Sequence, residues 1–309
     1  MNAPLIIFAY NRVDHLSETI KAVSKNYLAK ETDVFVFSDG ARNPQMEEPV
    51  MAVREYVRSV IDQNLFRSLT LKCSVENKGL AKSIIEGVTE IIDKYGRVIV
   101  IEDDVITSVD FLPFMNDCLN FYKDDDNVWS IGAYNVVGQP KDGKDVFIAQ
   151  RICSSAWATW KDRWEKIDWE VRNYKKFRFN LLKRKRFNKF GNDRSVMLDE
   201  QQAGLNNSWA IRSCYSEFEN NCFTVYPAIA RVKNIGFDGS GENCLAPNSK
   251  LMTEISNCKI PYKLEHLSEP TSEVVLMFQN TYNSSFLYST IRWVKALFRI
   301  KGGLLRKFK

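Results

Sequence analysis

The 309-residue sequence lacks features that several common classes of protein need. Only two histidines, His15 and His266, are present, and none of the seven cysteines forms a Cys-x-x-Cys pair, so a zinc site is disfavoured. No apolar run is long enough to span a membrane, and the apolar stretch near the N-terminus is too short for a signal peptide. We therefore expect a cytoplasmic protein with reduced thiols.

Three common motifs are also missing. The sequence has no Gly-x-x-x-x-Gly-Lys-Ser/Thr, which excludes a P-loop ATPase. The first apolar run, Leu5–Ala9, is not followed by Gly-x-Gly-x-x-Gly, which disfavours a dinucleotide-binding fold. Gly-x-Ser-x-Gly, the nucleophile turn of many hydrolases, does not occur. The net charge of +5 is too small to indicate a nucleic-acid partner.

What is present is the composition of an ordinary globular protein, with 45% hydrophobic and 26% charged residues. Short apolar runs alternate with segments whose apolar residues recur every three or four positions. This alternation predicts an α/β fold with a mostly parallel sheet covered by helices. We expect strands at 5–9, 34–37, 69–75, 98–101 and 128–133, and helices near 14–23 (with Asp14 as the cap), 46–62, 80–91 and 109–122.

The alternation ends after Asn135. Four tryptophans follow between 157 and 169, then a segment rich in Lys and Arg at 172–190 and a strand-like run at 223–232. Tryptophans are usually core residues, but polar neighbours make a substrate-facing wall an alternative here. The basic segment is expected to be a solvated helix face.

Three consecutive acids, Glu102-Asp103-Asp104, directly follow the run 98–101. Ligands of open α/β sheets bind outside the carboxyl ends of the strands, and carboxylates there suit a hard cation such as Mg2+ or Mn2+. Such a cation neutralises the charge that grows on a departing diphosphate. Alternatively, the acids only solvate a loop, and Ser108 and Asp110 cap the next helix. Because adjacent carboxylates repel one another unless a positive charge separates them, we favour the metal site.

The order of several short motifs resembles a GT-A glycosyltransferase, and most of all N-acetylglucosaminyltransferase I and its bacterial relatives. These motifs are Phe8-Ala9-Tyr10-Asn11-Arg12, Ser38-Asp39-Gly40, Asn77-Lys78-Gly79-Leu80, Glu102-Asp103-Asp104-Val105 with Asp110-Phe111, and Ser130-Ile131-Gly132-Ala133-Tyr134-Asn135. The likeness continues through Trp157-Ala158-Thr159-Trp160 and Ser208-Trp209-Ala210, so it covers about residues 4–245.

The resemblance implies an inverting transfer from a nucleotide sugar, usually UDP-linked, with Mn2+ or Mg2+ as the cofactor. The acceptor would be a hydroxyl of a glycan or of a lipid-linked glycan. We therefore expect a GT-A catalytic domain over 1–245, with a nucleotide-sugar-binding half at 1–135 and an acceptor-side half at 136–245. Residues 246–309 form a basic, amphipathic extension.

The resemblance also implies roles for single residues. Asp104 would bind the metal, while Glu102 and Asp103 would contact sugar or ribose hydroxyls. Asp39 would accept a hydrogen bond from the uracil N–H, and Gly79 would allow the backbone to approach the donor closely. The other donor contacts would come from Tyr10, Asn11, Arg12, Asn77 and Lys78. As alternatives, Asn11 and Asp39 are ordinary turn formers and Lys78-Gly79 is a loop before a helix.

The sequence departs from the family at the general base that an inverting transferase needs. The family has an acid just before the tryptophan that corresponds to Trp209, whereas this sequence has Asn207-Ser208, neither of which is a base near neutral pH. The candidates are Asp199 and Glu200, which lie shortly upstream and are preferred, and then Asp238 and Glu242.

The C-terminal segment from Ser285 interleaves apolar and basic residues at helical spacing. This pattern suits a helix that lies on an anionic membrane surface, so we expect peripheral contact with the cytoplasmic face of a membrane. A basic helix docked on the protein's own core is the alternative. Two rival functions also stay open: a non-catalytic protein that binds sugar nucleotides or glycans, and a sugar-phosphate nucleotidyltransferase.

Overall fold

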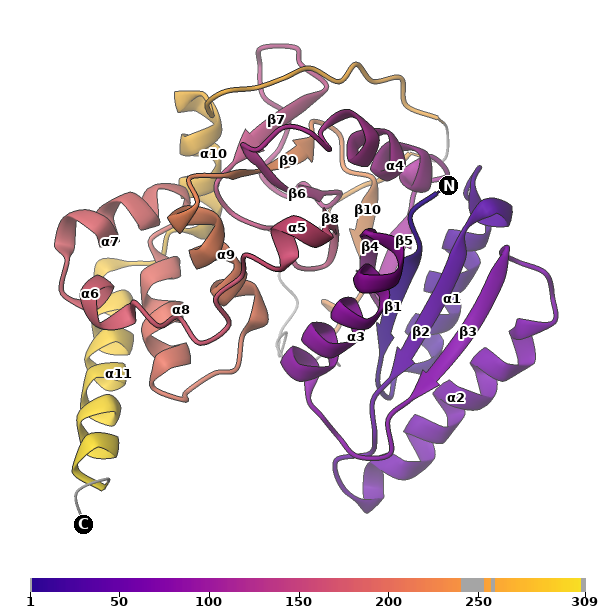
Figure 1. The fold of residues 1–309 in the computed structure, drawn as a ribbon, viewed down its shortest axis with the longest axis horizontal. Coiled ribbons are helices and arrows are strands. Elements are labelled where there is room, and N and C mark those ends of the chain that lie inside the picture. The colour runs from indigo at the N-terminus through magenta and orange to yellow at the C-terminus, as the bar shows by residue number, and fades with distance from the viewer. Residues whose placement is uncertain (1, 240–252, 257–258, 307–309) are drawn as a thin grey trace.

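The computed structural model describes residues 2–239, 253–256 and 259–306, with side chains up to Arg299. These residues form an eight-stranded mixed sheet covered by helices and a separate two-stranded ribbon (Figure 1). The expected fold class, a mostly parallel sheet with flanking helices, is confirmed. Within the described ranges, no helix has both the length and the hydropathy needed to cross a membrane.

One half of the sheet is parallel throughout, in the order β3-β2-β1-β4. Because these strands share one direction, their carboxyl ends lie along one edge of the sheet, where parallel α/β proteins bind ligands. The apolar runs predicted as strands all form strands, with ends that differ by one or two residues. They are β1 (Leu5–Ala9), β2 (Asp33–Ser38), β3 (Ser68–Cys73) and β4 (Arg97–Glu102).

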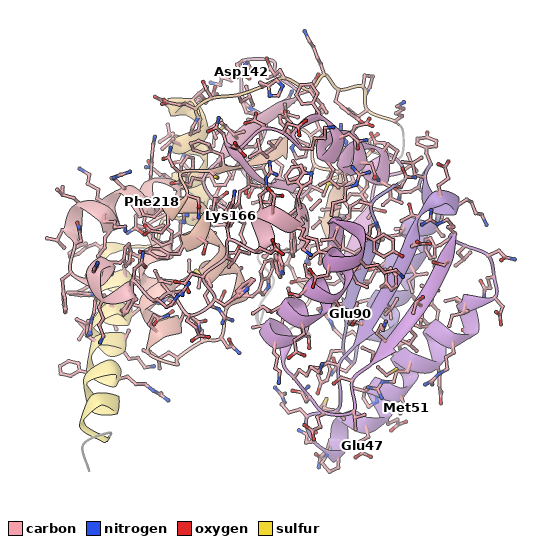
Figure 2. All side chains as sticks on the ribbon, in the orientation of Figure 1. Glu47, Met51, Glu90, Asp142, Lys166 and Phe218 are labelled. Carbon is pink, nitrogen blue, oxygen red and sulfur yellow. The ribbon has the colours of Figure 1, made fainter. Side chains whose placement is uncertain are left out.

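Helices cover both faces of this half, and every residue of β1 is therefore buried. Leu5 and Ile7 belong to the core cluster on the side of α1 and α2, whereas Ile6 and Phe8 pack on the side of α3. Figure 2 shows Glu47 and Met51 on α2 and Glu90 on α3, at the outer margin of these layers. The covering helices are α1 (Val13–Ser24), α2 (Glu47–Ile61) and α3 (Leu80–Tyr95), with short 3-10 turns at Ala29–Glu31 and Pro44–Met46, whereas α4 (Phe111–Phe121) packs on the other half of the sheet.

Two predicted helix caps are wrong. Arg12 is the N-cap residue of α1 and Asp14 lies inside the first turn, where its charge can favour the helix dipole but makes no cap. Asp110 stands at the N-cap of α4 without a capping hydrogen bond. Its carboxylate is buried instead, where it accepts a hydrogen bond from Ser108 (2.7 Å) and lies 3.4 Å from Nε of Arg231.

The second half of the sheet continues from β4 in the order β8-β6-β9-β7, with antiparallel steps except between β6 and β9. The run 223–232, predicted as one strand, is two strands in different sheets, because the chain leaves the main sheet after Pro227. The strands are β6 (Val128–Gly132), β7 (Val146–Ala149), β8 (Ala156–Trp160) and β9 (Phe223–Pro227), and the ribbon pairs β5 (Val105–Thr107) with β10 (Val232–Asn234).

Helices from the later part of the chain pack beside this half and extend the molecule away from β3 (Figure 1). The last and longest, α11, packs against α8, and Nε of Arg292 donates to Glu200 at 2.7 Å. The predicted domain boundary at 245/246 lies outside the described residues. The helices are α5 (Lys161–Trp164), α6 (Tyr174–Arg178), α7 (Leu181–Phe187), α8 (Asp193–Gln202), α9 (Trp209–Glu219), α10 (Ser272–Tyr282) and α11 (Phe286–Arg306), with a 3-10 turn at Asn188–Phe190.

Candidate active site

Glu102 ends β4, and Asp103 and Asp104 form the turn between β4 and β5, at the carboxyl edge of the parallel strands. Thr19 of α1 fixes this turn, because its hydroxyl donates to the carbonyl of Asp103 (2.7 Å) and accepts from the N–H of Val105 (3.1 Å). Thr19 is fully buried, and Asp103 and Asp104 are only 4% and 6% exposed. The turn therefore holds two carboxylates out of water, in a fixed position.

Arg12, at the end of β1, is the positive charge that separates these acids. Its Nη2 hydrogen-bonds to a carboxylate oxygen of Asp103 and to Oδ2 of Asp104, the latter at 2.8 Å. Burial alone would lower the pKa of Arg12, but the two carboxylates raise it. The structure thus brings together three of the residues that the sequence assigned to the donor and metal sites.

Negative charge exceeds positive charge in this turn. Burial raises the pKa of Asp103 to about 6 in spite of the contact with Arg12. Burial, together with the charges of Asp104 and Asp103, raises the pKa of the neighbouring Glu102 to about 8. One guanidinium therefore does not compensate three buried carboxyl groups, and further positive charge here would stabilise their ionised forms.

The opposite wall of the acidic turn comes from the segment after β10, far away in sequence. Asn234 donates to Oδ1 of Asp104 at 3.1 Å, and the N–H of Ile235 donates to the carbonyl of Asp104 at 2.8 Å. Gly236 follows, and a Cβ atom there would lie 2.0 Å from Oδ2 of Asp104. Only glycine leaves room for the carboxylate, so this glycine is part of the site.

A second group of predicted residues gathers around Asp39, just after β2. Oδ1 of Asp39 accepts from the backbone N–H groups of Gly40 and Lys78, each at 2.9 Å. Oδ2 accepts from the N–H of Gly79 (2.9 Å) and from the side chain of Asn77 (3.2 Å). A carboxylate has about four acceptor positions, and all are used. Asp39 therefore fixes the loop Asn77–Gly79, and its contact with a nucleobase stays a prediction.

The other predicted donor residues lie around this loop. Gly79 has a φ of +73°, and no atom within 4 Å of where its Cβ would stand. The positive φ favours glycine at the start of α3, and the close approach of a donor to this glycine stays a prediction. Tyr10 accepts from the N–H of Arg42 (3.1 Å), and the amide nitrogen of Asn11 lies 3.2 Å from the sulfur of Met46. Lys78 pairs with Glu86 at 2.7 Å.

The structure separates the preferred base candidates from the acidic turn. Asp199 is fully buried and ion-paired with Arg184 at 2.7 Å, and Glu200 is held by Arg292. Both belong to α8, on the far side of the molecule from β5 (Figure 1). Each carboxylate already binds an arginine in an interhelical contact, which is a structural role, so neither is suited to take a proton from an acceptor.

Asp238 is the base candidate that lies near the acids. It follows Gly236 by two residues, and its carboxylate is 3.1 Å from Nε2 of His15 on α1. The Asp238 side chain is 46% exposed, so an acceptor hydroxyl can reach it. Glu242, the remaining candidate, lies outside the described residues. Nothing in the sequence motifs favoured Asp238, since its proximity to Asp104 depends on the pairing of β10 with β5.

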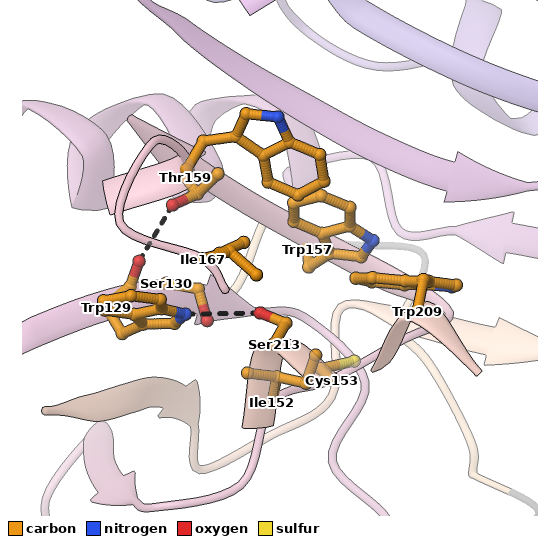
Figure 3. Close-up of a pocket in the computed structure, with 10 residues that line it drawn as sticks. Trp129, Ser130, Ile152, Cys153, Trp157, Thr159, Ile167, Trp209 and Ser213 are labelled. Atoms are coloured by element: carbon orange, nitrogen blue, oxygen red, sulfur yellow. Dashed lines mark hydrogen bonds between the residues drawn. The ribbon is translucent and has the colours of Figure 1, made fainter. Parts of the chain in front are cut away.

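Three of the four tryptophans between 157 and 169 are core residues, which disfavours an acceptor platform, whereas Trp169 is partly buried. Trp157, Trp160 and Trp164 are each at most 5% exposed. Figure 3 shows Trp157 and Trp209 side by side at a cavity of about 10 Å3, room for about one water molecule and too small for a sugar. Ser208 caps α9 by accepting from the N–H of Ile211 at 3.2 Å, which explains a serine where the family has an acid.

The acidic turn fits a hard divalent cation. Carboxylate oxygens of Asp103 and Asp104 converge on one point, which a nitrogen of Arg12 reaches in this structure. Oxygen ligands of this kind suit Mg2+ or Mn2+, which complete their coordination with substrate phosphates. Among the described residues, no group of three or more His, Cys, Asp or Glu side chains forms a complete metal cage. Two carboxylates are what a site shared with a diphosphate needs.

Comparison with known proteins gives similarity of structure only. No protein-family model and no curated protein matches the sequence. A mannosyltransferase from Pyrobaculum calidifontis, solved with GDP-Man and Mn2+, is 15% identical over 54% of this chain and 46% of its own, with a TM-score of 0.39. Residues 1–349 of S. aureus TarS are 13% identical over 75% of this chain and 60% of their own, with a TM-score of 0.42.

A third similar structure is a putative nucleotide-diphospho-sugar transferase from Desulfovibrio desulfuricans G20. It is 12% identical over 54% of this chain and 68% of its own, with a TM-score of 0.33. The matched segments span less than two thirds of the mannosyltransferase and TarS chains. Because every one of these TM-scores lies below 0.5, the roles of the site residues rest on the geometry of this chain.

Proposed function

We propose that the chain is a metal-dependent, inverting glycosyltransferase that uses a nucleotide diphosphate sugar, most simply a UDP-sugar. The sugar would pass to a hydroxyl of a glycan or a lipid-linked glycan. The observation that carries this proposal is the convergence of two buried carboxylates, Asp103 and Asp104, on one point at the carboxyl edge of the parallel strands. A cation there would lie where α/β sheets bind ligands.

In this proposal Asp104 is the direct ligand of Mn2+ or Mg2+, and Asp103 supports it. The bound cation supplies neutralisation of the negative charge on the departing diphosphate. Arg12 is suited to help, because its Nη1 is buried and has no hydrogen-bond partner among the described residues. This nitrogen faces the position of Gly236, 3.0 Å from where a Cβ would stand. A phosphate oxygen would give it the acceptor it lacks.

The transfer is a single displacement. The oxygen of the acceptor hydroxyl bonds to the anomeric carbon while the bond from that carbon to the phosphate oxygen breaks. The electron pair leaves with the nucleoside diphosphate, and the hydroxyl proton passes to a carboxylate base. We assign that base to Asp238, which His15 holds beside the acidic turn. Attack opposite to the leaving group inverts the anomeric configuration.

The test is binding followed by turnover. We would measure the melting temperature with UDP, GDP, CDP or dTDP, each with and without Mn2+, for the wild type, Asp104→Asn and Glu90→Gln. Glu90 is an exposed acid on α3 and serves as the matched control. A nucleotide at ~100 times its dissociation constant stabilises the native state by about 2.7 kcal/mol.

We expect one nucleotide to stabilise the wild type and Glu90→Gln in a Mn2+-dependent manner, and Asp104→Asn to lose that dependence. Failure of every nucleotide to shift the melting temperature of the wild type would refute the donor site. The panel of nucleotides also identifies the nucleobase of the donor. The contacts of Asp39 do not identify it, because its carboxylate already accepts four hydrogen bonds within the protein.

A non-catalytic binding protein is the second candidate, favoured by the capping serine that stands where the family has its base. Turnover separates the two candidates. A transferase releases the nucleoside diphosphate when an acceptor is present, whereas a binding protein returns the donor intact. The nucleotidyltransferase alternative predicts pyrophosphate release from a nucleoside triphosphate and a sugar phosphate, and a separate incubation with these two substrates tests it.

A further inference from the structure

Helix α11 presents an apolar stripe to solvent. Leu287, Ile291, Val294 and Phe298 are spaced by four, three and four residues, so they share one face of the helix. Their exposed fractions are 69%, 58%, 37% and 71%. The opposite face is the one that packs on the protein, where Ala296 is fully buried. Helix α11 thus packs on the protein, as the alternative of a docked basic helix expected, but its apolar stripe faces away from that contact.

A second apolar protrusion lies between α6 and α7. Phe179, Leu181 and Leu182 are 68%, 77% and 78% exposed, although side chains of these types are usually buried. They are the same segment that the sequence presented as a solvated basic face. Three adjacent apolar side chains held in water cost free energy unless something covers them.

The two features lie at the same end of the molecule, where α6, α7 and α11 gather (Figure 1). Arg184 of α7 connects them, because its guanidinium carbon is 6.0 Å from the ring centroid of Trp293 on α11. The same guanidinium pairs with Asp199 on α8, at 2.7 Å. We call the exposed residues Phe179, Leu181, Leu182, Leu287, Ile291 and Phe298 the terminal patch.

The two segments that carry the terminal patch are basic. Residues 171–192 and 274–309 contain no Asp or Glu, although acids make up 38 of the 309 residues. The acids that reach α7 and α11 come from α8 and α9, and each is paired: Asp199 with Arg184, Glu200 with Arg292 and Glu219 with Lys183. Exposed basic side chains remain on both elements, Lys185 and Arg186 on α7 and Lys295 and Arg299 on α11. A basic and apolar surface is complementary to a partner that is apolar and negatively charged.

We propose that the terminal patch docks on an anionic lipid membrane, with the apolar side chains in the acyl boundary and the basic ones at the headgroups. A second copy of the chain fits less well, because it would bring the unpaired basic side chains of two identical surfaces together. Both α11 and the α6–α7 protrusion take part, so the contact is broader than the C-terminal helix that the sequence indicated. This contact does not depend on the proposed transferase activity.

The test is co-sedimentation of the full-length protein with vesicles of phosphatidylcholine alone, or of phosphatidylcholine with phosphatidylglycerol. We expect binding to the anionic vesicles only, and loss of that binding at high salt. Each basic residue near anionic lipid is worth about fivefold in partitioning, so Lys185→Gln with Arg186→Gln lowers the partition coefficient about 25-fold. Leu181→Ser with Leu182→Ser lowers it by about tenfold or more.

Matched controls remove equal charge or equal exposed apolar surface elsewhere. Lys21→Gln with Lys82→Gln, on α1 and α3, and Tyr27→Ser with Leu276→Ser, all at exposed positions, should bind like the wild type. The proposal is overturned if the wild type does not sediment with anionic vesicles, if it binds both vesicles equally, or if the patch variants bind as the controls do. Sedimentation equilibrium tests whether a second copy of the chain binds the patch instead. If the wild type is a dimer and Ile291→Ser with Phe298→Ser makes it a monomer, the patch is a dimer interface and the membrane proposal is wrong.

Discussion

The contact between Gly236 and Asp104 makes a single added methyl group a strong test of the site. An alanine Cβ at position 236 would stand 2.0 Å from Oδ2 of Asp104, 2.8 Å from its Cγ and 3.0 Å from Nη1 of Arg12. Carbon and oxygen atoms that are not bonded do not approach so closely. In Gly236→Ala, the carboxylate must therefore rotate or the segment after β10 must move away from the acidic turn.

The two consequences differ in size. Rotation of the carboxylate gives up its hydrogen bond to Arg12 or to Asn234, and overpacking of this kind costs about 1–3 kcal/mol of folding stability. A domain of this size can stay folded after such a loss. Misplacement of a reacting or metal-binding group by about 1 Å, in contrast, can lower the rate about 10²-fold. We thus expect a folded protein with at least that loss of transfer activity.

The measurement combines urea denaturation with release of nucleoside diphosphate as a function of Mn2+ concentration. Gly204→Ala is the matched control, because Gly204 has a φ of +64° and open space around its Cβ position, in the loop after α8. Alanine there costs about 1–2 kcal/mol of backbone strain without touching the acidic turn. If Gly236→Ala keeps wild-type activity and Mn2+ dependence, Asp104 is not the ligand that we describe.

Three further predictions concern other carboxylates. In Asp39→Asn the NH2 group faces at least one backbone N–H donor in either orientation, so the variant should have a lower melting temperature without ligand and a higher KM for the donor. An unchanged melting temperature would instead favour a role of Asp39 in binding the nucleobase. Asp238→Asn should lower kcat about 10²-fold or more and leave nucleotide binding unchanged, whereas equal rates would exclude it as the base. Burial raises the pKa of Glu217 to about 8, so its stabilising effect is full below about pH 4.5 and is lost as pH rises through 8. Urea titrations should therefore show Glu217→Gln gaining stability relative to the wild type across that window, and parallel pH curves would contradict this.

The strands and the acidic turn were predictable because their signals are local. Four consecutive β-branched residues, 98–101, favour a buried strand on their own, and the acids that follow must lie at its carboxyl end. The parallel order of β1, β2 and β4 then places Arg12 and Asp39 along the same edge. Fold class and donor edge follow from patterns of a few residues each.

What the sequence could not indicate depends on contacts between distant segments. Residues 223–232 read as one apolar strand, but Pro227 ends β9 and the chain crosses to pair with β5 in another sheet. The exposure of Leu181 and Leu182 could not be predicted either, because the charge pattern of this segment does not indicate which apolar side chains are buried. Likewise, Asp199 and Glu200 precede Trp209 in the chain, yet each is taken up by an arginine from another helix.

The candidate site itself shows how much of a function can depend on such a crossing. Asp104 offers one oxygen to Arg12, the N-cap residue of α1, and the other to Asn234, which lies 130 positions later in the sequence. Without the β5–β10 ribbon, Gly236 and Asp238 would have no reason to lie beside the acidic turn, and the turn would lose the wall that fixes its second carboxylate. The acids carry negative charge in any position, but a carboxylate can hold a cation against a diphosphate only when its orientation is fixed. The short ribbon, and not the large sheet, therefore turns an acidic strand end into a site.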